Sequence, residues 1–413
     1  MVIVKDKKVV LAYSGGLDTS VILKWLIDKG YEVITYTADV GQTKDFEKLK
    51  EKALKLGASK AYVLDLKKEF VTDFIFEALK CNASYENQYL LGTALARPLI
   101  AKKHIEIAKK ENASAVAHGC TGKGNDQVRF EIIYLTQYPE AEIITPWKDM
   151  EYLSKFKGRS DLIKYANKKG IPLSKQSTKY STDDNLMHIS YESGPLEDIK
   201  KHPDFNFLQM CVLPKDAPDN ETKIEVEFKK GIPVKVTDIE NRKTAQEPVE
   251  IVQMLNKIAG ANGIGIVNMV ESRFVGMKNH GVYETPGMTV LHYAHKQIES
   301  ITLDKEVIQL KDSLTPKFSQ LVYNGLWYSP EMEMLKHAVN KSQETVSGKV
   351  CISLYKGNMT MLGIESKNSL YDGDLVSMEK AGDYDPSDAN GFIKINALRL
   401  KLYEKAKKNE TLG

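Results

Sequence analysis

Near the start of the chain an apolar run, two glycines and a helical pattern follow one another, and this order constrains the fold most. Residues 9–11 are Val-Val-Leu, which is typical of a buried strand, and Gly15 and Gly16 come shortly afterwards. Apolar Val21, Ile22 and Trp25 then recur at helical spacing. The chain is therefore expected to end a strand, turn sharply and begin a helix.

The same alternation continues to about residue 170. Strands are expected at 9–13, 32–38, 61–64, 115–118 and 142–144, and helices at 18–29, 44–56, 70–79, 95–111 and 158–169. Repeated strand–helix units predict an α/β fold with a doubly wound parallel sheet. Ligands bind beyond the carboxyl ends of the strands in such sheets. The loops after the first and fourth strands are therefore expected to meet at one edge.

Beyond residue 170 the pattern becomes that of a mixed α+β domain. Five prolines interrupt residues 171–222, and hairpins are expected at 223–238 and 350–364. Helices are expected at 249–259, 288–303, 307–321 and 332–341, with a turn rather than a nucleotide loop at 260–265. A last helix at about 390–408 has an apolar and a basic side. The expected domains are 1–170, 171–365 and a helical arm at 366–413.

Composition excludes several classes of protein. The 413 residues include 58 Lys plus Arg and 55 Asp plus Glu, a balance that does not favour nucleic acid as a partner. No apolar run approaches the length of about 20 residues that spans a membrane. The four cysteines form no C-x-x-C pair, and the N-terminus resembles no signal or transit peptide. A cytoplasmic enzyme that binds neither nucleic acid nor membranes is expected.

Residues 12–20, Ala-Tyr-Ser-Gly-Gly-Leu-Asp-Thr-Ser, have the chemistry of a phosphate-binding loop. A helix N-terminus carries unpaired N–H groups and positive dipole charge, and glycines let the backbone approach a ligand closely. The loop is not of the Walker type, because no G-x-x-x-x-G-K-[ST] motif occurs. An ordinary strand–helix turn with a serine cap is the alternative.

A second polar string, AHGCTGKGNDQVRFE, spans residues 117–131. Its glycines free the backbone, and Arg129 and Asp126 suit the carboxylate and the ammonium of a zwitterionic ligand. A solvated loop is the alternative. Cys120 is interpreted as a buried structural cysteine. His292 and His295 are three residues apart but lack a carboxylate partner pattern, so a metal site there is not favoured.

Several strings also resemble known families. SGGLDTS resembles the pyrophosphate loop of the ATP pyrophosphatases, SGGxD[ST]S, and AHGCTGKGNDQVRFE is similar to the second signature of the argininosuccinate synthases. The strings at 89–98, 185–192 and 281–286 agree with the same family, so that the resemblance runs from about residue 8 to 405.

The resemblance implies an ATP-dependent, AMP-forming C–N ligase with a domain like the adenine nucleotide alpha hydrolases. It would join citrulline to aspartate through a citrullyl-adenylate, giving argininosuccinate, AMP and pyrophosphate, a step of arginine biosynthesis and the urea cycle. ATP and Mg²⁺ would be required, with no metal site made by protein side chains alone. The resemblance also implies a homotetramer whose C-terminal helices cross between subunits.

Site residues follow from the resemblance at matching positions, with Asp18 and Asp126 as the catalytic residues. ATP would contact Ala12, Tyr13, Ser14, Gly15, Gly16, Leu17, Asp18, Thr19, Ser20, Ala38, His118 and Gly119. Citrulline would contact Tyr89, Thr93, Asn125, Arg129, Ser181, Ser190, Glu271 and Tyr283, and aspartate would contact Thr121, Asn125 and Asp126. Ala94 stands where many animal members have serine, so that a hydroxyl contact to citrulline is not expected there.

Three other functions fit part of the pattern. A tRNA thiolase of the same fold would need a cysteine pair and a basic surface, and an amidotransferase-type synthetase would need a glutaminase nucleophile. A nucleotide-binding sensor would not need the full set of charged residues. A pyrophosphate-release assay with citrulline and aspartate separates these alternatives.

Overall fold

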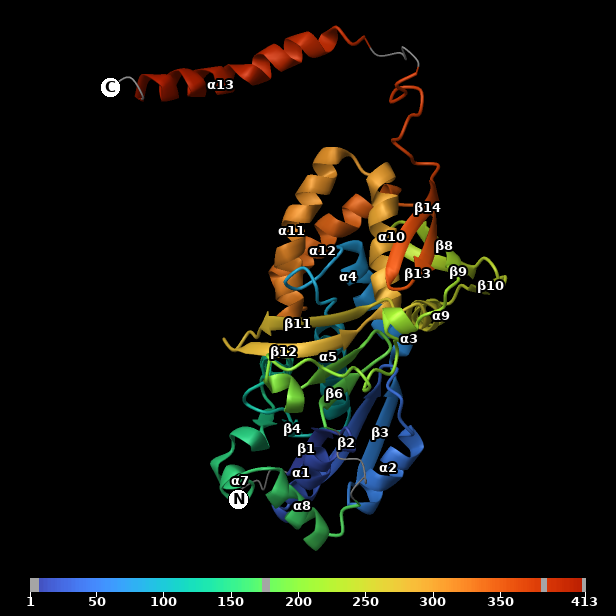
Figure 1. Ribbon diagram of the computed structural model, residues 1–413. Coiled ribbons are helices and arrows are strands. Elements are labelled where there is room, and N and C mark those ends of the chain that lie inside the picture. Colours follow the sequence, from blue (N-terminus) through green and yellow to red (C-terminus); the bar gives the residue numbers. More distant parts are fainter. Residues whose placement is uncertain (1–6, 173–178, 380–384, 411–413) are drawn as a thin grey trace. The chain divides into compact units, whose positions relative to one another are not determined.

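The computed structural model describes residues 7–172, 179–379 and 385–410. Five parallel strands form its first sheet, in the order β3-β2-β1-β4-β5 (Figure 1). They are β1 (Lys8–Ala12), β2 (Glu32–Asp39), β3 (Lys60–Asp65), β4 (Ala115–Ala117) and β5 (Glu142–Ile144). The order reverses between β1 and β4, so the loops after these two strands flank the topological switch point.

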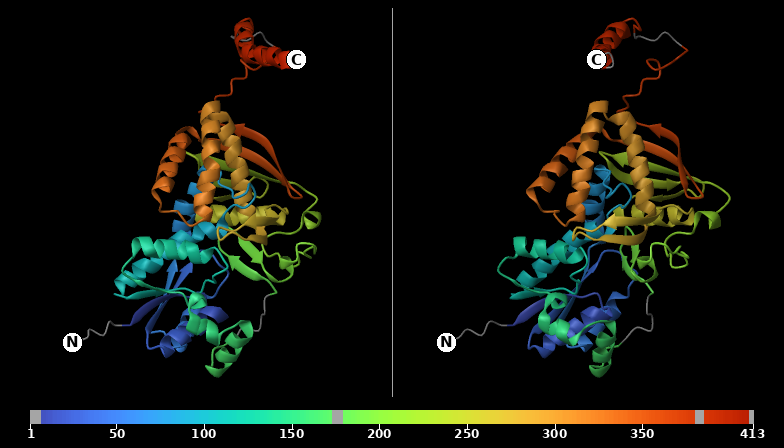
Figure 2. Two further views of the ribbon diagram at one scale, coloured as in Figure 1. Left: turned by 90° about the vertical axis from the view of Figure 1, so that its left-hand side faces the viewer. Right: turned by 60° about the vertical axis from the view of Figure 1, so that its left-hand side comes forward.

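Helices cover both faces of this sheet, as Figures 1 and 2 show. Val9 and Leu11 of β1 share one core cluster with one set of helices, whereas Val10 points to the opposite face and packs with another set. The first set is α1 (Leu17–Asp28), α2 (Phe46–Lys55), α7 (Met150–Lys155) and α8 (Arg159–Lys168). The second is α5 (Gly92–Lys110) and α6 (Asp126–Gln137). The predicted doubly wound parallel sheet is confirmed.

Three details of this part differ from the prediction. The helix expected at 70–79 is three consecutive pieces: α3 (Lys67–Phe70), the π-helical η1 (Val71–Ile75) and α4 (Phe76–Lys80). The short helix α7 is absent from the predicted set, and so is α6. Its first two turns carry Asp126, Arg129 and Glu131, which interrupt the apolar spacing of an amphipathic helix.

The later part contains a five-stranded antiparallel sheet in the order β10-β9-β8-β13-β14, and both expected hairpins are confirmed. Its strands are β8 (Thr222–Lys229), β9 (Ile232–Asp238), β10 (Lys243–Ala245), β13 (Gly348–Tyr355) and β14 (Asn358–Glu365). The helices are α9 (Pro248–Ala261), α10 (Pro286–Thr302), α11 (Lys305–Tyr323) and α12 (Pro330–Ser342). Gly263 and Gly265 have φ of +72° and +96°, which confirms the turn after α9.

A second antiparallel sheet, in the order β11-β12-β7-β6, was not predicted. Its strands are β6 (Ser181–Asp184), β7 (Ile189–Glu192), β11 (Ile266–Ser272) and β12 (Lys278–Glu284). Figure 1 shows β11 and β12 between the parallel sheet and helices α10 to α12. Short 3₁₀ turns complete the fold: η2 (Pro146–Lys148), η3 (Gly194–Glu197), η4 (Pro214–Asp216) and η5 (Gln343–Thr345).

The chain divides into two compact units, Met1–Asn368 and Ser369–Gly413. One hydrophobic cluster of the first unit includes Val10 of β1 and Leu354 of β13, so its core is continuous across residue 170. The domain boundaries expected at 170 and 365 stay predictions. The second unit contains α13 (Asp388–Glu410). No helix within the described ranges is long and apolar enough to cross a membrane.

Candidate active site

The loop between β1 and α1 is a glycine turn at a helix N-terminus. Gly15 has a φ of +75°, and Gly16 is the N-cap of α1 with no side-chain capping hydrogen bond. A Cβ on Gly119, in the loop after β4, would lie 3.3 Å from Thr19 Cγ2. The structure therefore brings the second glycine loop against the first turn of α1, at the carboxyl edge of the sheet, where the parallel order places a ligand.

Several residues predicted to contact ATP point their side chains into the protein. The hydroxyls of Tyr13 and Ser20 are 3.1 Å apart and both residues are buried, as is Ala38. His118 is also buried, and its Nδ1 accepts a hydrogen bond from the N–H of Cys120 (3.2 Å). These buried side chains therefore support the loops from inside the protein.

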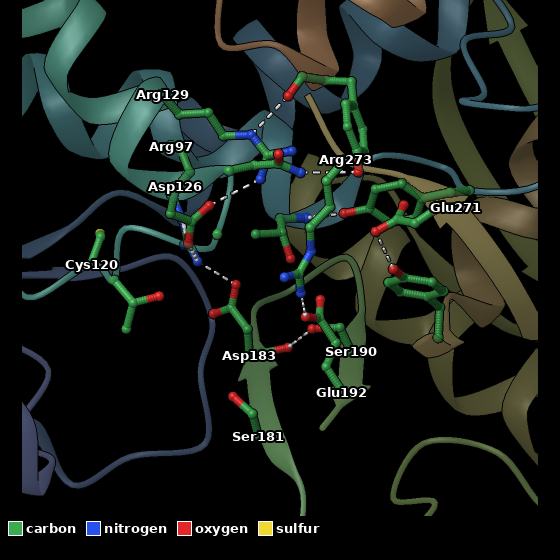
Figure 3. Close-up of a pocket in the computed structure, with 17 residues that line it drawn as sticks. Arg97, Cys120, Asp126, Arg129, Ser181, Asp183, Ser190, Glu192, Glu271 and Arg273 are labelled. Atoms are coloured by element: carbon green, nitrogen blue, oxygen red, sulfur yellow. Dashed lines mark hydrogen bonds and ion pairs between the residues drawn. The ribbon is translucent and has the colours of Figure 1, made fainter. Parts of the chain in front are cut away.

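A cavity of about 200 Å³ lies beside the second glycine loop (Figure 3). All the residues predicted for citrulline and aspartate line it: Tyr89, Thr93, Thr121, Asn125, Asp126, Arg129, Ser181, Ser190, Glu271 and Tyr283. Residues 12–20 are not part of its lining. Further lining residues are Arg97, Cys120, Gly124, Asp183, Glu192, Arg273 and Tyr323.

The unpredicted four-stranded sheet forms one wall of this cavity. Strand alternation places Ser181 and Asp183 on one face of β6, and Ser190 and Glu192 on one face of β7. Asp183 is paired with Ser190 across the two strands, and Ser190 with Tyr283 of β12. Four polar groups from the consecutive strands β6 and β7 therefore face the same space, beside Tyr283 of β12, which lies about 90 residues farther along the chain.

Asp126 is held between two arginines. Arg129 Nη1 lies 2.9 Å from Asp126 Oδ1, and Arg97 Nε donates to Oδ2 at 2.9 Å. Arg97 also forms an ion pair with Asp183 (Figure 3). Burial would raise the pKa of Asp126, but the attraction of Arg97 and Arg129 outweighs it and lowers the pKa to about 2. Asp126 is therefore ionised throughout the physiological pH range.

Glu271, like Glu192, has a raised pKa, opposite in direction to the shift of Asp126. Tyr283 donates to Glu271 Oε1 at 3.0 Å, and a Cβ on Gly281 would lie 2.7 Å from the Tyr283 hydroxyl, so glycine leaves room for this bond. Glu271 Oε2 is buried and has no hydrogen-bond partner among the described residues. Burial raises the pKa of Glu271. This oxygen is available to a donor on a ligand.

The turn after β11 is bonded to the second glycine loop. The Phe274 N–H donates to Asn125 Oδ1 (2.9 Å), and Asn125 Nδ2 donates to the Tyr323 hydroxyl (3.0 Å). Arg273 pairs with Glu192 at 2.6 Å and donates to the Lys123 carbonyl at 3.3 Å. The cavity is thus closed on this side by contacts between segments about 150 residues apart.

Sequence reasoning missed five charged or aromatic lining residues and misread Cys120, which lines the cavity. Arg97 was detectable as a charge within the apolar helical stretch 91–101, and Glu192 lies two residues after the predicted Ser190. Asp183, Arg273 and Tyr323 carry no comparable local signal.

The two histidines of α10 are bonded to other parts of the protein: His292 bonds the Asn82 carbonyl, and His295 bonds Asn82 and Gln343. Within the described residues no group of three potential metal ligands occurs.

Comparison with known proteins agrees with this architecture. Residues 8–172 match the family model of the arginosuccinate synthase N-terminal HUP domain, and residues 180–403 match that of the C-terminal domain. The argininosuccinate synthase of Thermotoga maritima is 57% identical over 403 residues, covering 97% of this chain and 98% of the relative. Those of Xenopus laevis and Mus musculus are 51% and 50% identical over 404 residues, covering 97% and 98% of this chain and 98% of each relative.

An ATP-using ligase built on a HUP domain is the class that the sheet, the glycine loop and these matches define. More narrowly, the chain belongs to the argininosuccinate synthase family. Its activity is argininosuccinate synthase, the activity that the full-length relatives carry by name. The resemblance found in the sequence, the fold class and the ligase function are confirmed.

Proposed function

We propose that ATP binds at residues 12–20 and that citrulline and aspartate bind together in the 200 Å³ cavity. The observation that carries the proposal is the convergence of all the residues assigned to the two amino acids on one cavity, although they come from six separate parts of the chain. The second glycine loop lines this cavity and also lies against the first turn of α1, next to the loop at residues 12–20 that would hold the α-phosphate. Both amino acids would then lie within reach of the reacting phosphorus.

The cavity has a charged partner for each charged group of the two amino acids. Citrulline and aspartate together carry three carboxylates and two ammonium groups, and the cavity offers three guanidinium groups and four carboxyl groups. A guanidinium binds a carboxylate through two parallel hydrogen bonds. Arg129 is proposed for the citrulline carboxylate, and Asp126 for the aspartate ammonium. The cations are Arg97, Arg129 and Arg273, and the acids are Asp126, Asp183, Glu192 and Glu271.

The chemistry explains the need for ATP. The ureido oxygen of citrulline is a poor leaving group, so it first attacks the α-phosphorus and the bond to the bridging oxygen breaks toward pyrophosphate. The amine of aspartate then adds to the ureido carbon, loses a proton, and AMP departs with the C–O electron pair. The protein's contribution is to hold the three reactants in line and to stabilise charge on the leaving groups.

Mg²⁺ is proposed to accompany ATP. Asp18 lies in the first turn of α1, and none of the ion pairs of the described residues involves it. Burial raises the pKa of Asp18, opposed by its own backbone N–H and by Arg159. One carboxylate together with phosphate oxygens is a usual ligand set for Mg²⁺, so Asp18 fits this role. The ion would neutralise charge on the phosphates.

Isotope transfer tests the citrullyl-adenylate route of this proposal directly. Citrulline labelled with ¹⁸O in the ureido group is incubated with ATP and aspartate, and the AMP is analysed by mass spectrometry. The label is expected in the phosphate of AMP, with one pyrophosphate released per argininosuccinate. Label that stays out of AMP, or pyrophosphate release that does not need citrulline, would contradict the adenylate route.

Arg129→Leu and Asp126→Asn are expected to affect different substrates. A lost charge-assisted hydrogen bond costs about 1.5–3 kcal/mol, or roughly 10- to 150-fold. We expect Arg129→Leu to raise the KM of citrulline and Asp126→Asn to raise that of aspartate, each by such a factor. Steady-state kinetics with each substrate varied in turn provide the measurement. An exchange of the two effects would reverse the assigned ligand orientation.

We also propose that the protein is a homotetramer in which α13 docks on a neighbouring subunit. The apolar side chains of α13 are exposed, including Phe392 at 69% and Leu402 at 68%. Such a surface is usually covered in solution. Deleting residues from Asp385 onward is expected to convert the tetramer to smaller species, measured by multi-angle light scattering, with pyrophosphate binding retained. An unchanged mass per particle would exclude this role.

A further inference from the structure

Lys52 of α2 reaches the first glycine loop from a neighbouring helix. Its Nζ donates to the Gly15 carbonyl at 2.8 Å, across 37 residues of sequence. The side chain is partly buried. An ammonium group has three N–H donors, and the bond to Gly15 uses one of them. Two donors and the full positive charge therefore remain at the loop that begins α1.

This ammonium has no carboxylate partner. Two other lysines of α2 are paired, Lys48 with Asp45 and Lys55 with Glu51, whereas no acid lies within ion-pair distance of Lys52 in the described ranges. Burial alone lowers the pKa of Lys52, and nothing nearby opposes this shift. A cation taken from water without a counter-ion is costly, and a bound anion would remove that cost.

The loop supplies the rest of an anion site. Gly16 caps α1 without a side-chain bond, so the first N–H groups of the helix are not satisfied by a capping side chain. Gly15 is pressed against α2, since a Cβ there would lie 3.0 Å from Leu49 Cδ1. Helix α2 therefore brings both an apolar support and a charge to the same turn.

We propose that Lys52 is a further ATP-binding residue, which contacts the β- and γ-phosphates and neutralises the pyrophosphate as it leaves. The assignment rests on the proposed ATP site at residues 12–20. As the ureido oxygen bonds to the α-phosphorus, the electron pair of the breaking P–O bond passes to pyrophosphate. The fixed ammonium stabilises that charge where it develops, and no proton transfer is required.

A purely structural role is the alternative, in which Lys52 only ties α2 to the loop. Lys52→Gln separates the two roles, because the amide can still donate to the Gly15 carbonyl but carries no charge. Lys52→Arg keeps the charge. Lys24→Gln is the matched control: Lys24 is also partly buried, and its Nζ also donates to a backbone carbonyl, that of Leu56 at 3.2 Å.

The probes are inorganic pyrophosphate and AMP, each titrated alone by calorimetry. In Lys52→Gln, pyrophosphate binding is expected to weaken about tenfold or more while AMP binding changes less than threefold. Lys52→Arg should retain most of the pyrophosphate affinity, and Lys24→Gln all of it. Equal loss of both ligands in Lys52→Gln, or unchanged pyrophosphate affinity, would overturn the proposal.

Failure of the ATP-site assignment itself has a different signature. In that case Gly15→Val would leave pyrophosphate and AMP affinities at wild-type values, whatever the Lys52 variants show. If Lys52→Gln were too unstable to titrate, Lys52→Arg against Lys52→Met in citrulline-dependent ATP–pyrophosphate exchange would decide. The charge-retaining variant must then exceed the neutral one by about tenfold or more for the proposal to hold.

Discussion

Gly15→Val is expected to fold, and its rate of citrulline-dependent ATP–pyrophosphate exchange is expected to fall about 100-fold or more. A loss of this size is typical when one hydrogen-bond donor to the charge that develops in the transition state is removed. Gly15 has a φ of +75°, a conformation that costs a branched residue about 1–2 kcal/mol. Its Cβ would also lie 3.0 Å from Leu49 Cδ1, so the turn must shift away from α2. The N–H groups of the loop would then no longer point at the phosphates.

Gly30→Val is the matched control for backbone strain. Gly30 has a φ of +85° after α1, and a Cβ there would meet nothing within 4 Å. Both variants should lower the melting temperature, since both carry an unfavourable φ, and Gly15→Val should lower it further because of the contact with Leu49. Only Gly15→Val should lose the exchange reaction. Equal activity of the two variants would show that the loop does not bind ATP.

The glycine loop was predictable because its signals are local. A strand, two glycines and a helix N-terminus occupy about a dozen consecutive residues, and each has its own composition. The hairpin at 222–238 was predictable for the same reason, since its turn residues lie next to the strands they join. The π-helical turn at Val71–Ile75 was not, because it alters the helical phase without a characteristic residue.

The sheet β11-β12-β7-β6 was not predicted, because its strands carry polar residues that line the cavity. Strand β6 reads Ser-Thr-Asp-Asp, and both β7 and β11 carry a glutamate that lines the cavity, so the usual alternation of apolar and polar residues is weakened. The pairing of β7 with β12 also joins residues about 90 apart, for which a single sequence has no signal. The individual site residues came from the resemblance, whereas the ion pairs of Arg97 and Arg273 required the three-dimensional arrangement.

Arg97→Met is expected to lower the free energy of unfolding by about 3 kcal/mol at pH 7. This value is the lower end of the range of about 3–5 kcal/mol for removing one partner of a buried ion pair. Arg97 of α5 has 13% of its side chain exposed, is bonded to Asp126 and is the only cation paired with Asp183 in the described part of the chain. Without it two carboxylates face each other across the cavity with Arg129 as their nearest partner. Chemical denaturation at several pH values measures the effect.

The pH dependence of the unfolding free energy shows whether the destabilisation in Arg97→Met comes from the lost charge. In the wild type the pKa of Asp126 is about 2, below its ordinary 3.8, so the ionised group stabilises the fold above pH 4 and this contribution is lost as pH falls toward 2. In Arg97→Met the pKa of Asp126 rises because one of its two cations is absent, so the destabilisation grows with pH and nearly vanishes only at about pH 2 and below. A deficit independent of pH would instead indicate lost packing around the α5 side chain.

Asp183→Asn provides the compensating change. In the double variant Arg97→Met with Asp183→Asn, one of the two facing charges is absent, so about half of the lost stability should return and the pH dependence should weaken. Asp183→Asn alone leaves Arg97 bonded to Asp126 and should cost less than Arg97→Met, because Asp183 is about one-third exposed. A double variant less stable than Arg97→Met would mean that Asp183 supports the cavity wall by its hydrogen bonds rather than by its charge.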